Sequence, residues 1–163
     1  MSIQWREGMT IDHGTIDHDH QTLIALINQF CDTPLDDAGM LELQRIFDRL
    51  DRYTAIHFQR EEQLQRAANY PYREAHHREH GELIREMDGL RRKFGALVQT
   101  AGDLAMISAA PRPELARLHT TMAEFLRHWL VDHIVKSDLR MKPYAAEMAR
   151  LSGSFAPLAK AAA

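Results

Sequence analysis

The sequence predicts an all-α fold, an antiparallel up-down-up-down four-helix bundle with an N-terminal arm and a short C-terminal extension. Three observations support this fold class. Apolar residues recur at three- and four-residue steps over four long stretches, residues 18–33, 38–67, 72–99 and 113–136. Segments that contain proline, two of them also with glycine and acidic residues, separate these stretches. No stretch has the alternating pattern of a half-buried strand.

Length and composition limit the classes of protein to which the chain can belong. Its 163 residues suit one domain, expected over residues 1–145, with a partly flexible extension over 146–163. The net charge of −3 and the lack of a basic run argue against nucleic acid as a partner. The polar N-terminus and the absence of a long apolar run argue against a membrane. With Cys31 as the only cysteine, the expected location is cytoplasmic.

The first helix follows an arm that has no clear period. Residues 1–16 are expected to be extended, and Asp17 is expected to cap the helix over 18–33. His20, Leu23 and Ile24 lie on the apolar face of this helix. The segment DTPLDDAG then predicts a turn, because it combines proline, glycine and three aspartates.

The second helix carries the pair from which the functional argument starts. His57 and Glu61 stand about one helical turn apart, so both project from the same face. Apolar residues continue that face, including Phe47, Leu50 and Leu64. The pair therefore points into a core, where an unpaired charge is costly and a metal ion is a good partner.

The third and fourth helices add further histidines to apolar faces. The third helix has two heptad tracks, one beginning at His76 and the other at His80. The fourth helix presents Trp129 and His133 on its apolar face. The connection over 101–113 contains two prolines, and the chain beyond Pro143 is expected to form a short helix at most.

Three hairpins place the candidate donor groups at one height in the bundle. Two residues of an antiparallel hairpin lie level when the turn is near their sequence midpoint. The midpoint of His20 and His57 falls in the first turn, and that of Glu61 and His76 in the second. The histidines of the third helix paired with His133 have midpoints in the third connection. The residues predicted to share this layer are His20, His57, Glu61, His76, His80 and His133.

Asp138 joins the same layer only under a structural condition. It follows His133 by five residues, which on a regular helix would turn it about 140° away. We therefore predict that the fourth helix ends or unwinds near Ser137. Five imidazoles and two carboxylates are too many for one ion, whereas two first-row metals fit. Uneven sharing of the histidines would leave one metal with an open position for a small ligand.

Four segments carry a resemblance to a known family: IDHDHQTLIALIN (16–28), HFQREE (57–62), YPYREAHHREH (70–80) and HWLVDHIVKSD (128–138). With them the chain resembles the hemerythrins, in particular the single-domain bacteriohemerythrins. The resemblance implies two Fe ions in a non-haem centre with carboxylate and oxo or hydroxo bridges, which binds O2 reversibly for storage, delivery or sensing. It implies that His76, His80 and His133 hold one iron, that His20 and His57 hold the open one, and that Glu61 and Asp138 bridge them.

An apolar wall around the open position should keep the site dry. Trp129 is the first candidate for this wall, with ordinary core packing as the alternative, and Leu23, Ile24 and Phe58 stand behind it. Of the other histidines, His119 lies on the apolar stripe about 21 Å from His133 and is expected to be a hydrogen-bonded core residue. Those expected to lie off the core are His13, His18, His77 and His128.

Other functions stay open at this stage. The same centre could serve an enzyme that reduces nitric oxide or peroxide, or an iron or redox sensor. A bundle whose histidines bind zinc or nothing is a further alternative. The expected partners are O2 or another small diatomic or anionic ligand, and an oxygen-using enzyme that receives the O2.

Overall fold

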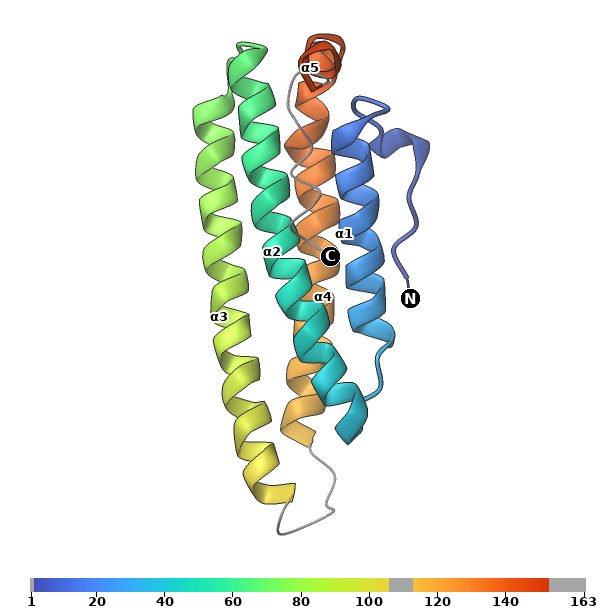
Figure 1. Cartoon of the computed structure of the whole chain (residues 1–163), viewed down its shortest axis with the longest axis vertical. Helices are drawn as coiled ribbons and strands as arrows, with labels where there is room; N and C mark the ends of the chain where they lie inside the picture. Colours follow the sequence, from blue (N-terminus) through green and yellow to red (C-terminus); the bar gives the residue numbers. More distant parts are fainter. Residues whose placement is uncertain (1, 106–112, 153–163) are drawn as a thin grey trace.

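The computed structural model describes residues 2–105 and 113–152 (Figure 1). Four long helices run alternately up and down: α1 (Thr15–Asp32), α2 (Asp37–Ala67), α3 (Arg73–Ala105) and α4 (Pro113–Lys136). In these residues no strand occurs. Each of α1 and α3 packs against both α2 and α4. The predicted antiparallel four-helix bundle is confirmed.

The N-terminal arm lies along the outside of α1 (Figure 1). A short 3-10 turn, η1 (Glu7–Met9), interrupts it. The Asn28 side chain holds the arm by two hydrogen bonds, since its oxygen accepts from the Ile3 N–H at 2.7 Å and its amide donates to the Ile3 carbonyl at 2.9 Å. The arm is therefore fixed to the helix that it precedes.

The prediction that Asp17 caps the first helix is wrong. The helix begins at Thr15, three residues earlier than predicted, and the Asp12 carboxylate accepts hydrogen bonds at its start. Asp12 accepts from the backbone N–H groups of Gly14 at 2.8 Å and Ile16 at 3.1 Å. Asp17 is buried in the first turn and accepts instead from Ile11 and His13, both at 2.8 Å. Its carboxylate thus ties the arm to the helix.

The turn before α2 explains why a glycine follows three aspartates. Asp36 caps α2, and its side chain accepts from the Gly39 N–H at 2.7 Å. A Cβ atom at Gly39 would lie 1.9 Å from the Pro34 carbonyl oxygen. Only glycine allows the chain to approach itself so closely here.

The sequence predicted the start of α3 to within one residue but not its end. At its start, Asn69 adopts a left-handed conformation with φ 53°, which asparagine tolerates well. At its end, the helix continues to Ala105, beyond the predicted limit of residue 99. Part of the expected connection over 101–113 is therefore helical, and residues 106–112 lie outside the described residues.

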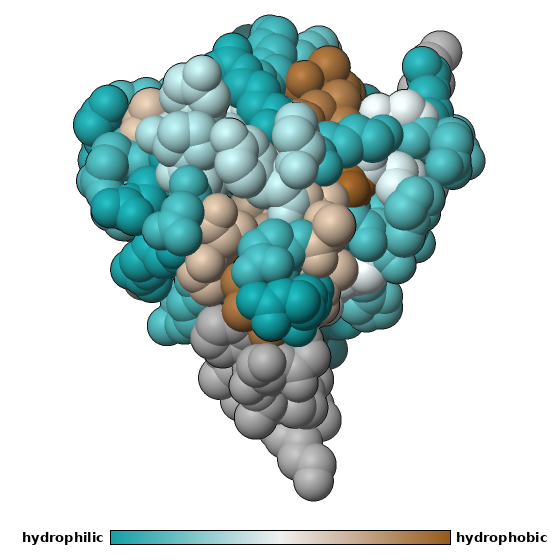
Figure 2. Space-filling view, turned by 90° about the horizontal axis from the view of Figure 1, so that it is seen from above, coloured by the Kyte–Doolittle hydropathy of each residue, from teal (hydrophilic) through white to brown (hydrophobic). Residues whose placement is uncertain are grey.

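The chain after α4 folds back over one end of the bundle. A 3-10 helix, η2 (Asp138–Tyr144), leads into α5 (Ala145–Ser152), which packs on α2 and η2. The first part of the expected extension is thus packed, while residues 153–163 lie outside the described residues. Figure 2 shows this end from above, with hydrophilic residues around small apolar patches. Among the described helices, none has the length and apolar composition that a membrane crossing requires.

Two apolar clusters leave a polar layer between them. The main cluster fills most of the bundle and includes Leu23 and Phe58. A smaller one lies under α5 and includes Ile16, Leu64 and Met148. On α1 and α2 the histidines and Glu61 fall between residues of the two clusters. The layer is therefore sealed along the bundle axis by apolar side chains on both sides.

Candidate metal centre

The polar layer contains all seven candidate donor residues. Every helix of the bundle contributes: α1 and α4 give one histidine each, α3 gives two, α2 gives a histidine and a glutamate, and η2 gives an aspartate. None of the seven is more than 7% exposed. The structure thus brings together His20, His57, Glu61, His76, His80, His133 and Asp138.

Asp138 lies at the centre of the layer because α4 ends before it. The helix stops at Lys136, and Asp138 begins the 3-10 helix that follows. The predicted end near Ser137 is confirmed. The Asp138 carboxylate lies 3.1 Å from Nε2 of His20, 3.1 Å from Nε2 of His133 and 3.2 Å from Nε2 of His76. One carboxylate therefore faces three helices.

Glu61 makes the matching contacts from α2. Its carboxylate oxygens lie 3.1 Å from Nε2 of His76, 3.4 Å from Nε2 of His57 and 3.6 Å from Nε2 of His80. All five imidazole rings thus turn the same nitrogen, Nε2, toward the two carboxylates. In a bundle core this common orientation is what a shared metal site requires.

Many of these atoms are close together but are not hydrogen-bonded. Both oxygens of Asp138 and the Nε2 atoms of His20, His57 and His76 are buried and have no hydrogen-bond partner. Buried polar atoms are normally satisfied, and each exception needs a cause. Here the unpartnered atoms face one another across the layer, so metal ions between them would satisfy several at once. The residues present therefore fit a metal centre.

The pKa values of the donor residues indicate that the two buried carboxylates need a positive charge beside them. Burial disfavours charge on His76, but Asp138 and Glu61 outweigh it and raise its pKa to about 10. Burial would likewise raise the pKa of Asp138, yet His133, His20 and His76 hold it well below its ordinary value. In the metal-free protein, protonated imidazole therefore neutralises the buried carboxylates. A divalent metal can take over that role.

The donor atoms divide into two groups. One contains Glu61, His76, His80, His133 and Asp138, and the other contains His20, His57 and Asp138. Within each group, the atoms that could bind a metal lie within 4.8 Å of one another. Asp138 belongs to both groups. The arrangement can therefore accommodate two ions with unequal numbers of histidines and a carboxylate between them.

Comparison with known proteins identifies the family. The model of the hemerythrin HHE cation binding domain matches residues 12–145. The chain belongs to the hemerythrin family. A bacteriohemerythrin of Methylococcus capsulatus is 29% identical over 125 residues, covering 77% of this chain and 82% of that protein. One from Stenotrophomonas maltophilia is 30% identical over 96 residues, covering 58% and 61%.

A solved structure of wild-type hemerythrin supports the same family. It is 26% identical to this chain, superposes with a TM-score of 0.67, and is covered over 98% of its length and 88% of this one. Membership of the hemerythrin family implies non-haem iron binding, and the buried layer of histidines and carboxylates is consistent with it.

Phe58 is an apolar residue in direct contact with the hemerythrin donor layer. Its ring stacks on His80 with centroids 3.7 Å apart and planes within 4°. It also lies 5.5 Å from the His57 ring and 5.6 Å from the His133 ring. Trp129 packs behind it at 6.1 Å. The other predicted wall residues, Leu23 and Ile24, are buried in the main cluster.

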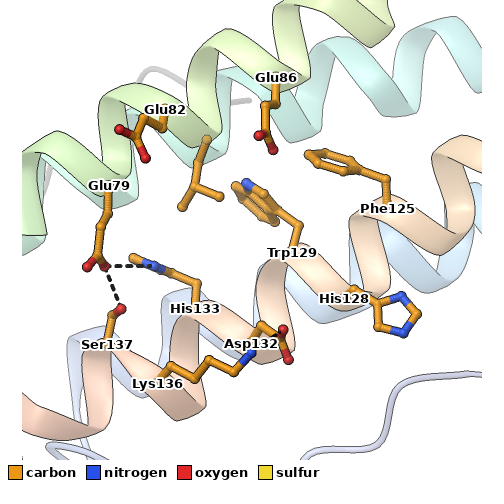
Figure 3. A pocket seen from close by; sticks show the side chains of 11 residues that line it. Glu79, Glu82, Glu86, Phe125, His128, Trp129, Asp132, His133, Lys136 and Ser137 are labelled. Atoms are coloured by element: carbon orange, nitrogen blue, oxygen red, sulfur yellow. Dashed lines mark hydrogen bonds and ion pairs between the residues drawn. The ribbon is translucent and has the colours of Figure 1, made fainter.

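A groove between α3 and α4 brings solvent near the hemerythrin layer. It has a volume of about 390 Å³, and Trp129, His133 and Ser137 are among the residues that line it (Figure 3). In Figure 3 Trp129 projects from α4 toward α3, and Glu79 contacts both His133 and Ser137. Trp129 is only 5% exposed and stands between this groove and Phe58.

Three residues near the hemerythrin layer were not found by sequence reasoning. Asp19 lies 3.5 Å from Nδ1 of His57, the Gln65 amide donates to Glu61 at 3.3 Å, and the Trp5 ring is 6.4 Å from that of His20. The midpoint of Asp19 and its partner Arg60 falls between Gly39 and Met40, just past the first turn, so the midpoint rule places this pair close to the level of His20 and His57. Nothing in the aperiodic arm indicated the place of Trp5.

The other histidines follow the predictions, with one exception. His119 makes the predicted hydrogen bond, with Nε2 3.1 Å from the Phe30 carbonyl, but it is half-buried and not a core residue. The remaining four are exposed, as expected: His13, His18, His77 and His128. Glu62, next to Glu61, lies 2.8 Å from Nδ1 of His80 and supports that ring from outside the layer.

Proposed function

We propose that this protein binds O2 reversibly at a non-haem di-iron centre. The observation that carries the proposal is the division of seven buried donors into an unequal pair of groups that share Asp138. In this assignment His76, His80 and His133 would hold one iron, and His20 and His57 would hold the other. Glu61 and Asp138 would supply carboxylate ligands to the pair.

The donor set favours ligand binding over oxidation of a substrate. Two iron ions bound here would supply electrons and one open coordination position for a diatomic ligand. Five neutral imidazoles and two carboxylates stabilise the reduced state better than a carboxylate-rich set would. The layer is sealed above and below by apolar residues, so only a small ligand can enter without displacing side chains.

The surrounding side chains have separate tasks. Phe58 covers one face of the His80 ring, packs at an angle against the His57 and His133 rings, and excludes water from these contacts. Trp129 closes the side that faces the groove, and Leu23 and Ile24 complete the apolar wall from α1. Gln65 donates its amide N–H to Glu61 and fixes the orientation of that carboxylate. A dry, ordered site of this kind would suppress side reactions of a bound ligand with water.

Metal analysis combined with the visible spectrum tests the proposal. The purified protein is reduced without oxygen, exposed to air, and reduced again, with spectra recorded at each stage. We expect two irons per chain and an absorption that appears with O2 and disappears on its removal. Zinc, or no metal, would overturn the assignment. Net consumption of nitric oxide or peroxide in the presence of a reductant, without reversible oxygenation, would favour an enzyme.

A further inference from the structure

Asp19 is a buried carboxylate that touches the donor layer from outside. It is 1% exposed and precedes His20 on α1. Its Oδ2 lies 3.5 Å from Nδ1 of His57, the nitrogen that faces away from the layer. We propose that Asp19 is a positioning residue that holds the proton of His57 on Nδ1 and so presents Nε2 to the metal. The inference rests on the proposed di-iron function.

The chemistry of the Asp19 carboxylate and the His57 imidazole determines which ring nitrogen carries the proton. An ionised carboxylate can only accept hydrogen bonds, and a neutral imidazole carries its proton on one nitrogen. A proton on Nδ1 faces Asp19 favourably and leaves the lone pair of Nε2 free. The opposite tautomer would set a lone pair against the carboxylate and block Nε2 with a proton. At 3.5 Å the contact acts through charge, since it exceeds ordinary hydrogen-bond length.

Two neighbours from α2 keep Asp19 ionised and fixed. The Tyr53 hydroxyl donates to Oδ1 at 2.8 Å, and the Arg60 guanidinium contacts both carboxylate oxygens. Both contacts favour a carboxylate that carries its full negative charge. The carboxylate therefore keeps its negative charge and its orientation next to the ring.

Two other imidazoles of the layer also have a carboxylate beside Nδ1, but these carboxylates are more exposed than Asp19. Glu62 lies 2.8 Å from Nδ1 of His80, and Glu79 lies 4.0 Å from Nδ1 of His133. The Glu62 and Glu79 side chains are 20% and 42% exposed, whereas that of Asp19 is 1% exposed. Because water screens exposed charges, Asp19 is the least screened of the three carboxylates.

Asp19→Asn tests the inference, because it keeps the size of the side chain and removes its charge. Ferrous iron is titrated without oxygen into the metal-free protein against a competing chelator, and the reduction potential of the loaded centre is measured. We expect a ten- to hundredfold weaker affinity for one of the two irons. The reduction potential should rise, because the ring has lost the carboxylate that makes it a stronger electron donor.

Asp132→Asn is the matched control. Asp132 directly precedes His133, as Asp19 precedes His20, but its side chain is 54% exposed and pairs with Lys136 at 2.7 Å. This variant should keep wild-type affinity and potential. Equal losses in the two variants would overturn the inference, and so would wild-type affinity and potential in Asp19→Asn.

A double variant separates positioning from a merely structural ion pair. Asp19→Asn combined with Arg60→Gln removes both charges, so no buried charge is left without a partner. If Asp19 only balances Arg60, the double variant regains the lost iron affinity, and the inference fails. We expect it to regain stability but not affinity. If the wild-type protein itself binds no second iron, the proposed function fails instead.

Discussion

Phe58→Ala is the most informative single substitution in the apolar wall. The side chain is 3% exposed and its ring lies flat on His80, 3.7 Å away. Truncation of a buried phenylalanine costs about 3–5 kcal/mol, a large part of the roughly 5–15 kcal/mol that stabilises a typical domain. The protein should therefore stay folded at low temperature but unfold at clearly lower urea concentration.

The same substitution should change the chemistry of the site. It opens a cavity next to the rings of His57, His80 and His133, where buried polar atoms can hold a water molecule. Water beside the metal layer should shorten the lifetime of the oxygenated absorption about tenfold, which corresponds to about 1.4 kcal/mol in the barrier.

Phe94→Ala separates the two effects. Phe94 is 2% exposed in the same core cluster, but it lies about 21 Å along α3 from His80. Urea unfolding should show a similar loss of stability in both variants, while the decay of the oxygenated spectrum should accelerate only in Phe58→Ala. Equal lifetimes in the two variants would refute the assignment of Phe58 to the wall. An unchanged unfolding midpoint in Phe58→Ala would refute the packing argument.

Three further predictions concern the metal, the pH and Trp129. A chelator should lower the melting temperature measured by calorimetry, because metal at about a thousandfold above its Kd adds about 4 kcal/mol to the folded state. In the metal-free protein, the raised pKa of His76 gives stability that is complete below pH 6.5 and is lost as the pH rises toward 10. Urea titrations across this range should show that decline, and the decline should be smaller in His76→Gln, in which only the raised pKa of His20 remains. Trp129→Phe should keep the fold and shorten the oxygenated lifetime, whereas an unchanged lifetime would assign Trp129 to packing alone.

The height of the donor layer was predictable because it depends on two simple properties of the chain. Helices rise by a fixed length per residue, and short turns bring antiparallel partners level near their sequence midpoint. His20 and His57 could therefore be paired without coordinates. Asp138 could join the layer only if α4 ended before it, and the helix does end at Lys136. The five-residue spacing from His133 had already indicated this end.

Features that depend on tertiary contacts were harder to predict. Composition favoured Asp17 as a helix cap, but the arm folds back so that Asp12 takes this place and Asp17 binds the arm. The two prolines of the segment 101–113 suggested a connection, yet α3 continues to Ala105, because both prolines lie beyond that residue. The buried contact of Asp19 depends on Arg60 from another helix, which no local pattern on α1 reveals.

The measurement that tests the central claim most directly is the crystal structure of the iron-loaded protein, with anomalous diffraction recorded at the iron absorption edge. We predict two anomalous peaks in the polar layer, one beside His76, His80 and His133 and the other beside His20 and His57. Asp138 should lie between them, and the second iron should have the open position. A single peak, peaks outside this layer, or two irons that are both fully coordinated by protein would contradict the account.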